Sequence, residues 1–327
     1  EPGSVLFLAA RMIVLIGNHS SILEVMDLVV RGAPTDSTVL IQGESGTGKE
    51  LVARALHDRS QRNEQGFISV NCSAFTETLL ESELFGHKKG AFTGAVADSE
   101  GFFKAADGGT LFLDEVADLS RTTQGKSRRA REERIVTPVG STCGEPVDVR
   151  IVAATNKNIL EEIEQGRFRE DLYYRLNVIP VWLTPLRERK DDIPLLAGFF
   201  LRRHSLRMSR EMTGISEEAI SRLQQYDWPG NVRELDNIIQ RHVALSSGSE
   251  IDSVELRGQS VGSTSDGQAS LQEFGIPEQG MDLEERLGEI EMGYLREALN
   301  ATGGNLTEAA RLLGMRYRSM RYREQKL

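Results

Sequence analysis

A glycine-rich loop between an expected strand and an expected helix is the feature that most restricts how this chain can fold. The segment Thr38–Ile41 is apolar and rich in β-branched residues, as a buried strand requires. Gly43–Lys49 follows it, and Leu51–His57 then has helical spacing of its apolar residues. A strand, a Gly-rich loop and a helix in this order predict a phosphate-binding loop. In such a loop, backbone N–H groups and the helix dipole point at the phosphates.

The loop consists of Gly43, Glu44, Ser45, Gly46, Thr47, Gly48 and Lys49, and Glu50 follows it. Lys49 is predicted to reach the β- and γ-phosphates of a nucleotide. Glu50 departs from the general pattern, because a Ser or Thr that ligates Mg²⁺ usually stands there. A chance Gly-rich turn is the alternative interpretation, and a second acidic strand farther along the chain argues against it.

That second strand is Gly109–Glu115, which ends in two carboxylates. Asp114 is predicted to hold Mg²⁺, directly or through water, and Glu115 to polarise the attacking water. Ile151–Asn156 is predicted to be a third core strand, whose polar end can sense the γ-phosphate. An acidic strand end alone is a weak signal, but together with the loop it predicts a site for ATP and Mg²⁺.

A hexapeptide with no evident part in that chemistry lies between the two halves of the predicted site. Its residues are Gly90, Ala91, Phe92, Thr93, Gly94 and Ala95. With these motifs in order, the chain resembles the AAA+ ATPases that activate sigma-54 RNA polymerase, the NtrC-like bacterial enhancer-binding proteins. GAFTGA is the signature of that family, and Glu50 also matches it.

Further motifs carry the same resemblance over residues 17–245. They are Glu83–His87, Arg167–Leu176, Pro185–Arg189 and Trp228–Leu235. Among these activators, the flanking sequence looks nearest to regulators of type IV pilus genes such as PilR.

The resemblance implies roles for residues that the motifs alone leave undecided. Asn71 is expected to hydrogen-bond Glu115 and hold it inactive until the partner is engaged. Asn156 is expected to be a first nucleotide sensor. Arg169 and Arg175 are expected to be arginine fingers that reach into the site of a neighbouring subunit.

The resemblance also implies a second sensor, Arg233, on a helical lid, and a loop tip of Phe92 and Thr93 that touches sigma-54. Simpler alternatives exist for these roles. Asn71 could cap a turn, Arg233 could pair with Glu234, and the two candidate fingers could lie on a solvated helix face. The hexapeptide could be a tight turn between helices, although a Phe exposed between glycines favours a contact surface.

Composition narrows the class of protein further. The 327 residues suggest two or three domains. A net charge of −10 means that any contact with DNA must be local. Two distant cysteines, Cys72 and Cys143, predict a reducing cytoplasm without a disulfide scaffold. The most apolar stretch, Val5–Ile16, is interrupted by Arg11, so neither membrane association nor secretion is expected.

The expected organisation is an α/β AAA+ domain with a P-loop and a parallel sheet, a helical lid, and a C-terminal Fis-type helix-turn-helix domain. The expected boundaries are 1–16 for a linker remnant, 17–184 for the α/β domain, 185–246 for the lid, 247–280 for a flexible linker and 281–327 for the DNA-binding domain. The linker is rich in Ser, Gly and Gln. A receiver domain, which many members of the family have, is not expected in this chain.

The terminal segment is predicted to form three helices, the second of them capped by Asn305. The last two, joined by a Gly turn, describe a helix-turn-helix. Its basic residues are Arg316, Arg318, Arg321, Arg323 and Lys326. Such a positive face fits DNA phosphates and base edges, and dimers place two such helices in successive major grooves. The alternative is a basic helix that pairs with the acidic first helix.

One segment departs from the family. Where an amphipathic helix of the type Q-x-K-L-L-R-x-L is usual, this chain has Gln124–Arg131, with Ser127, Arg128 and Arg131 at the three leucine positions. Arg121 also stands where a hydrophobic residue is common. The sequence leaves open whether this helix rotates, becomes exposed or disorders. Coupling between the ATP site and a second loop around Val136–Gly140 is therefore in question.

These observations predict an ATP-driven transcription activator that binds enhancer-like double-stranded DNA. It would assemble into a homo-oligomeric ring, hexameric by family analogy, and remodel sigma-54 RNA polymerase closed complexes. The first alternative is a DNA-binding regulator with a defective ATPase core, which the altered helix suggests. The second is a general AAA+ remodeller, against which GAFTGA and the terminal helix-turn-helix both argue.

Overall fold

A computed structural model describes residues 5–7, 14–246, 248–254, 256, 283–315 and 317–324. The chain separates into two compact units, residues 1–260 and 261–327. The predicted fold class is confirmed: a parallel α/β domain is followed by a helical lid and by a terminal unit of three helices.

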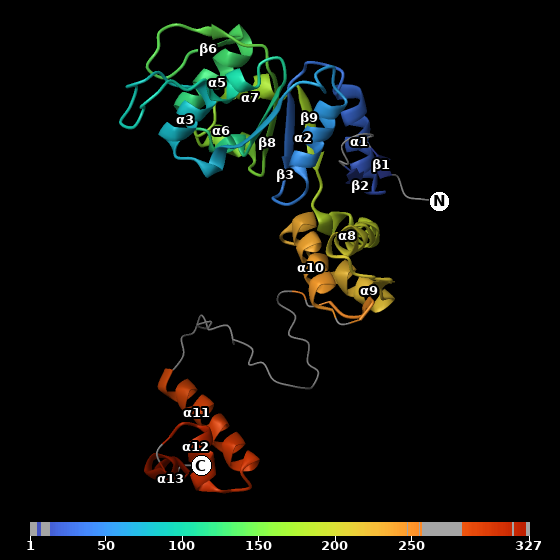
Figure 1. Ribbon diagram of the computed structural model, residues 1–327, viewed down its shortest axis with the longest axis vertical. Helices are drawn as coiled ribbons and strands as arrows, with labels where there is room; N and C mark the ends of the chain where they lie inside the picture. Colours follow the sequence, from blue (N-terminus) through green and yellow to red (C-terminus); the bar gives the residue numbers. More distant parts are fainter. Residues whose placement is uncertain are drawn as a thin grey trace. The chain divides into compact units, whose positions relative to one another are not determined.

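A five-stranded parallel sheet forms the centre of the first unit (Figure 1). In spatial order its strands are β4 (Phe67–Asn71), β5 (Thr110–Asp114), β8 (Arg150–Thr155), β3 (Val39–Gly43) and β9 (Ile179–Leu183). Every neighbouring pair is parallel. The segments that follow β3, β5 and β8 therefore leave from the same edge of the sheet, where ligands bind in open α/β folds.

Helices cover both faces of this sheet, as an all-parallel sheet requires (Figure 1). One face carries α1 (Ser20–Gly32) and α2 (Lys49–Asp58). The other carries α3 (Glu77–Phe85), α4 (Gly101–Ala105), α5 (Arg121–Glu133), α6 (Ile159–Glu164) and α7 (Glu170–Leu176). Side chains alternate between the two cores: Leu111 and Leu113 of β5 face one, and Phe112 faces the other.

The altered segment forms a regular helix, α5. Ser120 caps it by accepting a hydrogen bond from the Thr123 amide. Its buried residues are Thr123, Gln124, Ser127 and Ala130, so a narrow face of small and polar side chains turns inward. Arg128 and Arg131 are partly exposed, and Arg131 Nε donates to Thr38 Oγ1 at 3.0 Å. The helix therefore forms without burying an unpaired arginine.

Two short β-structures extend the first unit beyond the predicted boundaries. β1 (Val5–Phe7) pairs antiparallel with β2 (Val14–Ile16), and Leu15 and Ile16 are buried. The segment 1–16, expected to be a linker remnant, therefore contributes to the core. Three-residue strands are too short to produce a periodic signal in the sequence.

The lid contains α8 (Ile193–Met208), α9 (Glu217–Gln225) and α10 (Asn231–Leu245), after the 3₁₀ turns η3 (Leu186–Glu188) and η4 (Lys190–Asp192). Its core extends past the predicted end at residue 246. β10 (Gly214–Ile215) pairs in parallel with β11 (Glu250–Ile251), and Val254 and Leu256 are buried with the lid helices. The Ser and Gly residues near position 248 predicted a linker, but the apolar residues that follow them pack in the core of the lid.

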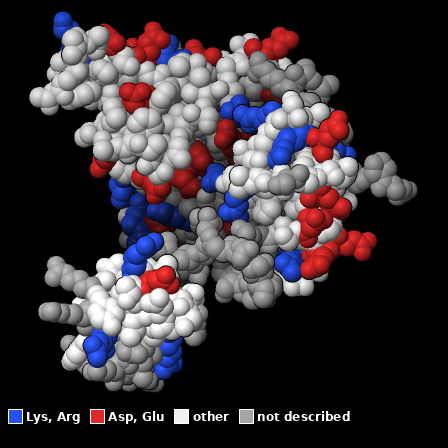
Figure 2. Space-filling view, turned by 60° about the horizontal axis from the view of Figure 1, so that its bottom comes forward, with Lys and Arg blue, Asp and Glu red and all other residues white. Residues whose placement is uncertain are grey.

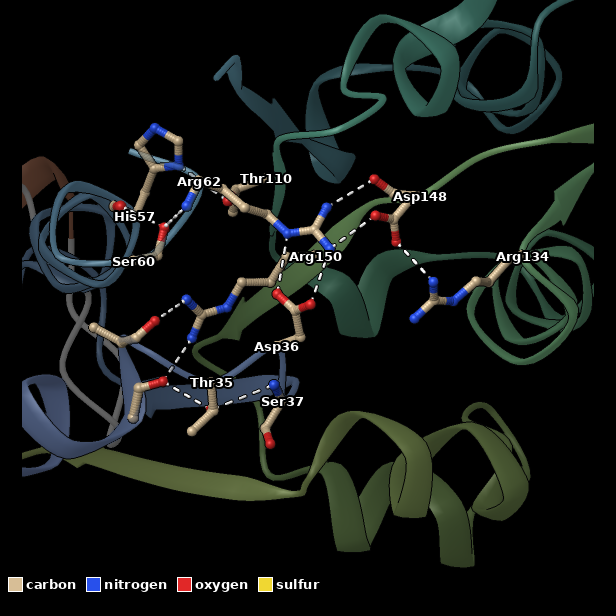
Figure 3. A network of polar contacts seen from close by, with 12 residues as sticks. Thr35, Asp36, Ser37, His57, Ser60, Arg62, Thr110, Arg134, Asp148 and Arg150 are labelled. Carbon is tan, nitrogen blue, oxygen red and sulfur yellow. Dashed lines mark hydrogen bonds and ion pairs between the residues drawn. The ribbon is translucent and has the colours of Figure 1, made fainter. Parts of the chain in front are cut away.

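A polar network holds together the amino-terminal edge of the sheet (Figure 3). Arg150 is 2% exposed and donates to the carbonyl oxygens of Ala33 (2.7 Å) and Gly32 (2.9 Å) at the end of α1. Such bonds satisfy carbonyls that a helix end leaves unpaired. Arg62 joins Asp36 to Asp148, each at 3.0 Å.

The second unit consists of α11 (Leu283–Ala301), α12 (Leu306–Leu312) and α13 (Tyr317–Glu324). Its core includes Leu295, Ala309, Ala310 and Met320. Asn305 Oδ1 caps α12, as predicted. Most of the predicted linker, 257–280, lies outside the described residues. Nowhere in the described part of the chain is a helix both long and apolar enough to span a bilayer.

Candidate nucleotide-binding site

The Gly-rich loop joins β3 to α2 in a conformation that needs two of its glycines. Gly46 has φ +81° and Gly48, which precedes α2, has φ +104°, values that other residues rarely adopt. A Cβ at Gly46 would lie 2.3 Å from the carbonyl oxygen of Gly230 in the lid. The loop therefore passes close to the lid and also presents the unbonded first amides of α2.

Lys49 is the buried cation of this loop, with 8% of its side chain exposed. Its Nζ donates to the Gly43 carbonyl at 2.9 Å and to that of Glu44 at 3.3 Å, and it lies 3.6 Å from Glu115 Oε1. Glu50 faces outward and pairs with Arg54 at 2.8 Å. The Glu50 carboxylate is thus held on the outer surface of α2.

Asp114 is the last residue of β5, and Glu115 follows it beside this lysine. Burial, reinforced by the neighbouring Glu115 charge, raises the pKa of Asp114. Glu115 has φ 52°, a left-handed conformation that costs a non-glycine residue about 1–3 kcal/mol. Its Oε2 accepts a hydrogen bond from the backbone N–H of Asn156 at 3.0 Å, so the residue after β8 fixes the direction of this carboxylate. The Asn156 side chain, the predicted sensor group, is exposed.

Asn71 does not make the expected contact with Glu115. Both residues are described, and no hydrogen bond joins them. Asn71 Oδ1 instead accepts from Ser73 N at 2.9 Å and Ser73 Oγ at 2.7 Å, capping the turn that follows β4. The local turn therefore occupies the side-chain oxygen of Asn71. Capping a turn is the simpler of the two roles that the sequence left open for this residue. Asn71 nevertheless pairs in register with Asp114.

The lid contacts the loop through the predicted second sensor. Arg233 N donates to the Gly46 carbonyl at 3.2 Å, and Arg233 Nη1 donates to Ser45 Oγ at 3.2 Å. The guanidinium is therefore held at the Gly-rich loop, and the pairing with Glu234 that the sequence left open is not found between these described residues.

Sequence reasoning missed two residues of this lid contact. Asn231 is fully buried: its Nδ2 donates to Glu44 Oε2 and to the Ser45 carbonyl, and its Oδ1 accepts from Leu186 N. Arg187 holds Glu44 with bonds of 2.6 and 2.8 Å. Hydrogen bonds from Arg187 and Asn231 lower the pKa of Glu44. The motifs around both residues were visible in the sequence, but their partners lie more than 140 positions away.

Both candidate arginine fingers lie on α7 or at its start and are held by acidic side chains. Arg169, the residue before α7, pairs with Asp171 at 2.7 Å, and Arg175 pairs with Glu132 at 2.7 Å. Their side chains are 35% and 60% exposed. Neither guanidinium contacts the Gly-rich loop of its own chain among the described residues.

The hexapeptide forms a tight turn closed by hydrogen bonds from Gly90 N to the Ala95 carbonyl (2.9 Å) and from Ala95 N to the Phe92 carbonyl (3.0 Å). Phe92 is 41% exposed and packs edge-on against His87, with ring centroids 5.0 Å apart. Lys88 N donates to the Val139 carbonyl, which ties the turn to the β6 (Ile135–Val136) and β7 (Glu145–Pro146) hairpin. Thus the turn and the second predicted loop are joined.

The candidate DNA-binding residues are described in part. Arg321 is exposed on α13. Arg318 and Arg323 lie on the same helix, but their side chains are not among those that the structure describes. Arg316 and Lys326 lie outside the described residues. Figure 2 shows both basic and acidic side chains on the face that it draws.

These residues fit a nucleotide and a magnesium ion. The Gly-rich backbone and Lys49 supply donors for phosphates, and Asp114 and Glu115 supply hard oxygen ligands beside them. The described residues contain no group of three or more His, Cys, Asp or Glu placed for a metal. Mg²⁺ at this site would therefore rely on Asp114 together with phosphate oxygens, as is usual for this ion.

Comparison with protein families gives matches along nearly all of the chain. Residues 15–182 match the Sigma-54 interaction domain, residues 187–272 the AAA+ ATPase lid domain, and residues 286–327 the Bacterial regulatory protein, Fis family. The first two matches contain the loop, the acidic strand and the lid contact described above.

Known proteins of similar sequence include transcriptional regulatory protein ZraR of Klebsiella oxytoca, 47% identical over 92% of this chain and 66% of that protein. Response regulator protein PilR of Pseudomonas aeruginosa is 45% identical over 96% of this chain and 69% of that protein. The chain thus spans about two thirds of the length of these relatives.

Solved structures of NtrX from Brucella abortus in complex with ADP and with ATP superpose with TM-scores of 0.71 and 0.70, at 33% and 34% identity. They match 97% and 95% of this chain and 69% of the NtrX chain. Because the three domain matches, the relatives and this structural similarity agree, the chain belongs to the sigma-54-dependent AAA+ transcriptional activators.

Proposed function

We propose that this chain hydrolyses ATP in a homo-oligomeric ring and uses the energy to remodel sigma-54 RNA polymerase closed complexes. It would be attached to enhancer-like double-stranded DNA through residues 281–327. The observation that carries the proposal is that Lys49 and Glu115 lie 3.6 Å apart beside Asp114, in the same domain as a surface turn with the sequence GAFTGA.

Each residue has a separate part in the proposed reaction, ATP + H₂O to ADP + phosphate. Lys49 balances charge on the β- and γ-phosphates, Asp114 holds Mg²⁺, and Glu115 orients the attacking water. Asn156 and Arg233 respond to the phosphates from β8 and from the lid. Asn71 would act only after leaving Ser73.

The proposed arginine fingers act between subunits. Arg169 and Arg175 are partly exposed and make no contact with the Gly-rich loop of their own chain among the described residues, which supports a role across a subunit boundary. Fingers supplied in trans raise hydrolysis by about 10³–10⁵-fold in GTPases. The turn with Phe92 and Thr93 at its tip is the proposed contact for sigma-54.

The test is Mg-ATP hydrolysis per subunit, measured as a function of protein concentration. A specific rate that rises with concentration is expected, because each site needs an arginine from its neighbour. Lys49→Ala and Arg169→Ala should each be inactive alone, and a mixture should regain activity through mixed boundaries. A rate near zero at every concentration would show that the ATPase core is defective and would leave a DNA-binding regulator.

A further inference from the structure

Three arginines and two carboxylates form a continuous row of ion pairs between α5 and α7. Arg169 holds Asp171 with bonds of 2.9 and 2.7 Å, and Arg175 Nε lies 2.7 Å from Glu132 Oε1. Arg128 stands between these pairs. Its Nη1 contacts Glu132 Oε2, and its Nε lies 3.4 Å from Asp171 Oδ2. Each carboxylate therefore serves two guanidinium groups.

The local structure fixes Arg128 in this position. Arg128 and Glu132 are one helical turn apart on α5, a spacing at which opposite charges meet. One turn earlier on α5, the side chain of buried Gln124 accepts a hydrogen bond from the backbone N–H of Arg169 at 2.8 Å. It also donates a hydrogen bond to the Arg167 carbonyl at 3.0 Å. These hydrogen bonds attach the start of α7 to α5. They thereby bring the charged side chains of the two helices next to one another.

The charges in this row do not balance, because three cations share two anions. Arg128 and Glu132 are the least exposed members, at 27% and 25%, so water screens their interaction less than that of Arg175. Hydrogen bonding to Arg169 is the main cause that lowers the pKa of Asp171, and the Arg128 charge contributes. Asp171 is therefore held as an anion from two sides.

We propose that Arg128 is a positioning residue that lowers the cost of releasing Arg169 and Arg175 toward the phosphates of ATP on a neighbouring subunit. The inference rests on the proposed function of these two arginines. When either one leaves, its carboxylate keeps Arg128 as a partner and is not left as an unpaired anion. The Arg128 charge also repels both guanidinium groups, which favours their departure.

A basic hollow beside this row adds to the positive charge around Arg169. Its volume is about 260 Å³, and its charged lining comes from Arg121, Lys126, Arg128, Arg129 and Arg169. Arg129 is exposed and forms no ion pair within the described residues, whereas Lys126 pairs with Glu81 at 2.7 Å. An excess of cations around a surface hollow attracts anions to the place where Arg169 is released.

The test compares kcat and KM for ATP at protein concentrations where the assembly is complete. Arg128→Met, which keeps the aliphatic stem, is expected to lower kcat about two- to fivefold, the factor that an ion pair of up to about 1 kcal/mol corresponds to. KM and the concentration dependence should stay unchanged. Arg128→Lys retains the charge and should restore most of the rate. Arg222→Met is the matched control, because Arg222 makes a similar pair with Glu218 on α9.

The second step separates positioning from a structural role. Adding Asp171→Asn to Arg128→Met removes the carboxylate that would detain Arg169, and kcat should recover toward the unmodified value. An equally slow double variant, or an Arg128→Met enzyme of normal rate, overturns the inference. If Arg128→Met fails to fold, the Asp171→Asn variant carries the test, because kcat should then rise or stay unchanged.

The two proposals fail in different ways. If Arg169→Ala and Arg175→Ala hydrolyse ATP normally, the finger role is wrong and the role of Arg128 falls with it. If both are slow while Arg128→Met is unaffected, only the inference on Arg128 is refuted.

Discussion

The two cysteines have opposite surroundings, which gives them different reactivity. Cys72 is 2% exposed, and burial, aided by the Asp114 charge, raises the pKa of its thiol to about 12. Cys143 is exposed. At pH 8 we expect one thiol per native chain to react with a disulfide reagent and two after denaturation, because thiolate is the reactive form. Native Cys143→Ser should react negligibly; rapid reaction of Cys72 would contradict the burial.

A substitution at Phe92 is expected to separate ATP hydrolysis from the contact with sigma-54. Its side chain is exposed, packs against His87, and is distant in sequence from the loop and acidic strand of the nucleotide site. Phe92→Ala is expected to keep the ATPase rate within about twofold and to change unfolding free energy by about 1 kcal/mol or less. Binding to sigma-54, measured by co-sedimentation with an ATP analogue, should be lost. Val96→Ala, at a side chain 79% exposed, is the control.

Single residues were predictable where a motif fixes their neighbours. Lys49 follows its glycines directly, and Asp114 ends a strand, so local sequence places both. For Asn71 the sequence left two partners open, and the structure has the local one, because Ser73, two residues away, donates to the side-chain oxygen of Asn71. Nor was the contact of Asn231 with Glu44, which depends on how the lid closes on the loop.

Among the elements, α5 contains a buried polar atom that its sequence does not explain. Ser127 is 3% exposed, and its Oγ has no hydrogen-bond partner. Ser127→Ala should raise the unfolding free energy by about 1 kcal/mol, since it removes an unsatisfied hydroxyl. Ser221→Ala, at an exposed helical position on α9, measures how much of the change in unfolding free energy comes from the higher helix propensity of Ala. Equal effects in urea denaturation would contradict the expectation.

The network at the start of β8 predicts a dependence of stability on pH. Hydrogen bonding to Arg62 lowers the pKa of Asp36 (Figure 3). A lowered pKa contributes stability above the unfolded value of about 3.9 and loses it as pH falls through the folded value. Asp36→Asn should therefore lower the melting temperature at pH 7, and the difference should shrink below about pH 4. A constant difference down to pH 2 would argue against this ion pair.

The elements differ in how well sequence anticipates them. The helical lid as a whole was predicted from its sequence motifs, and α8, α9 and α10 form it. β10 and β11 have two residues each and are defined by pairing with each other, which no local pattern reports. α5 forms although arginines replace an apolar stripe, because its inward face needs only Thr123, Gln124, Ser127 and Ala130.

At the scale of the whole molecule, Asn231 joins the lid to the nucleotide domain. Its side chain bonds Glu44, Ser45 and Leu186, and its φ is 52°. Asn231→Ala leaves buried groups unpaired and places Ala in a left-handed conformation. We expect a loss of about 2–4 kcal/mol in unfolding free energy. Chemical denaturation measures it, and a loss near zero would show that this contact is dispensable.

The order of strands has a consequence for how the chain acquires its structure during synthesis. β3 ends at Gly43, yet its two neighbours are β8 and β9, and β9 ends at Leu183. The strand that leads into the Gly-rich loop thus has neither flanking strand until β8 ends at Thr155, about 112 residues later. It lacks its second neighbour until β9 ends at Leu183, about 140 residues after Gly43, which takes about 7–28 s at 5–20 residues per second. Throughout that interval an apolar strand has at least one open edge, so we expect a nascent chain arrested before Leu183 to be a substrate for chaperones rather than a folded precursor.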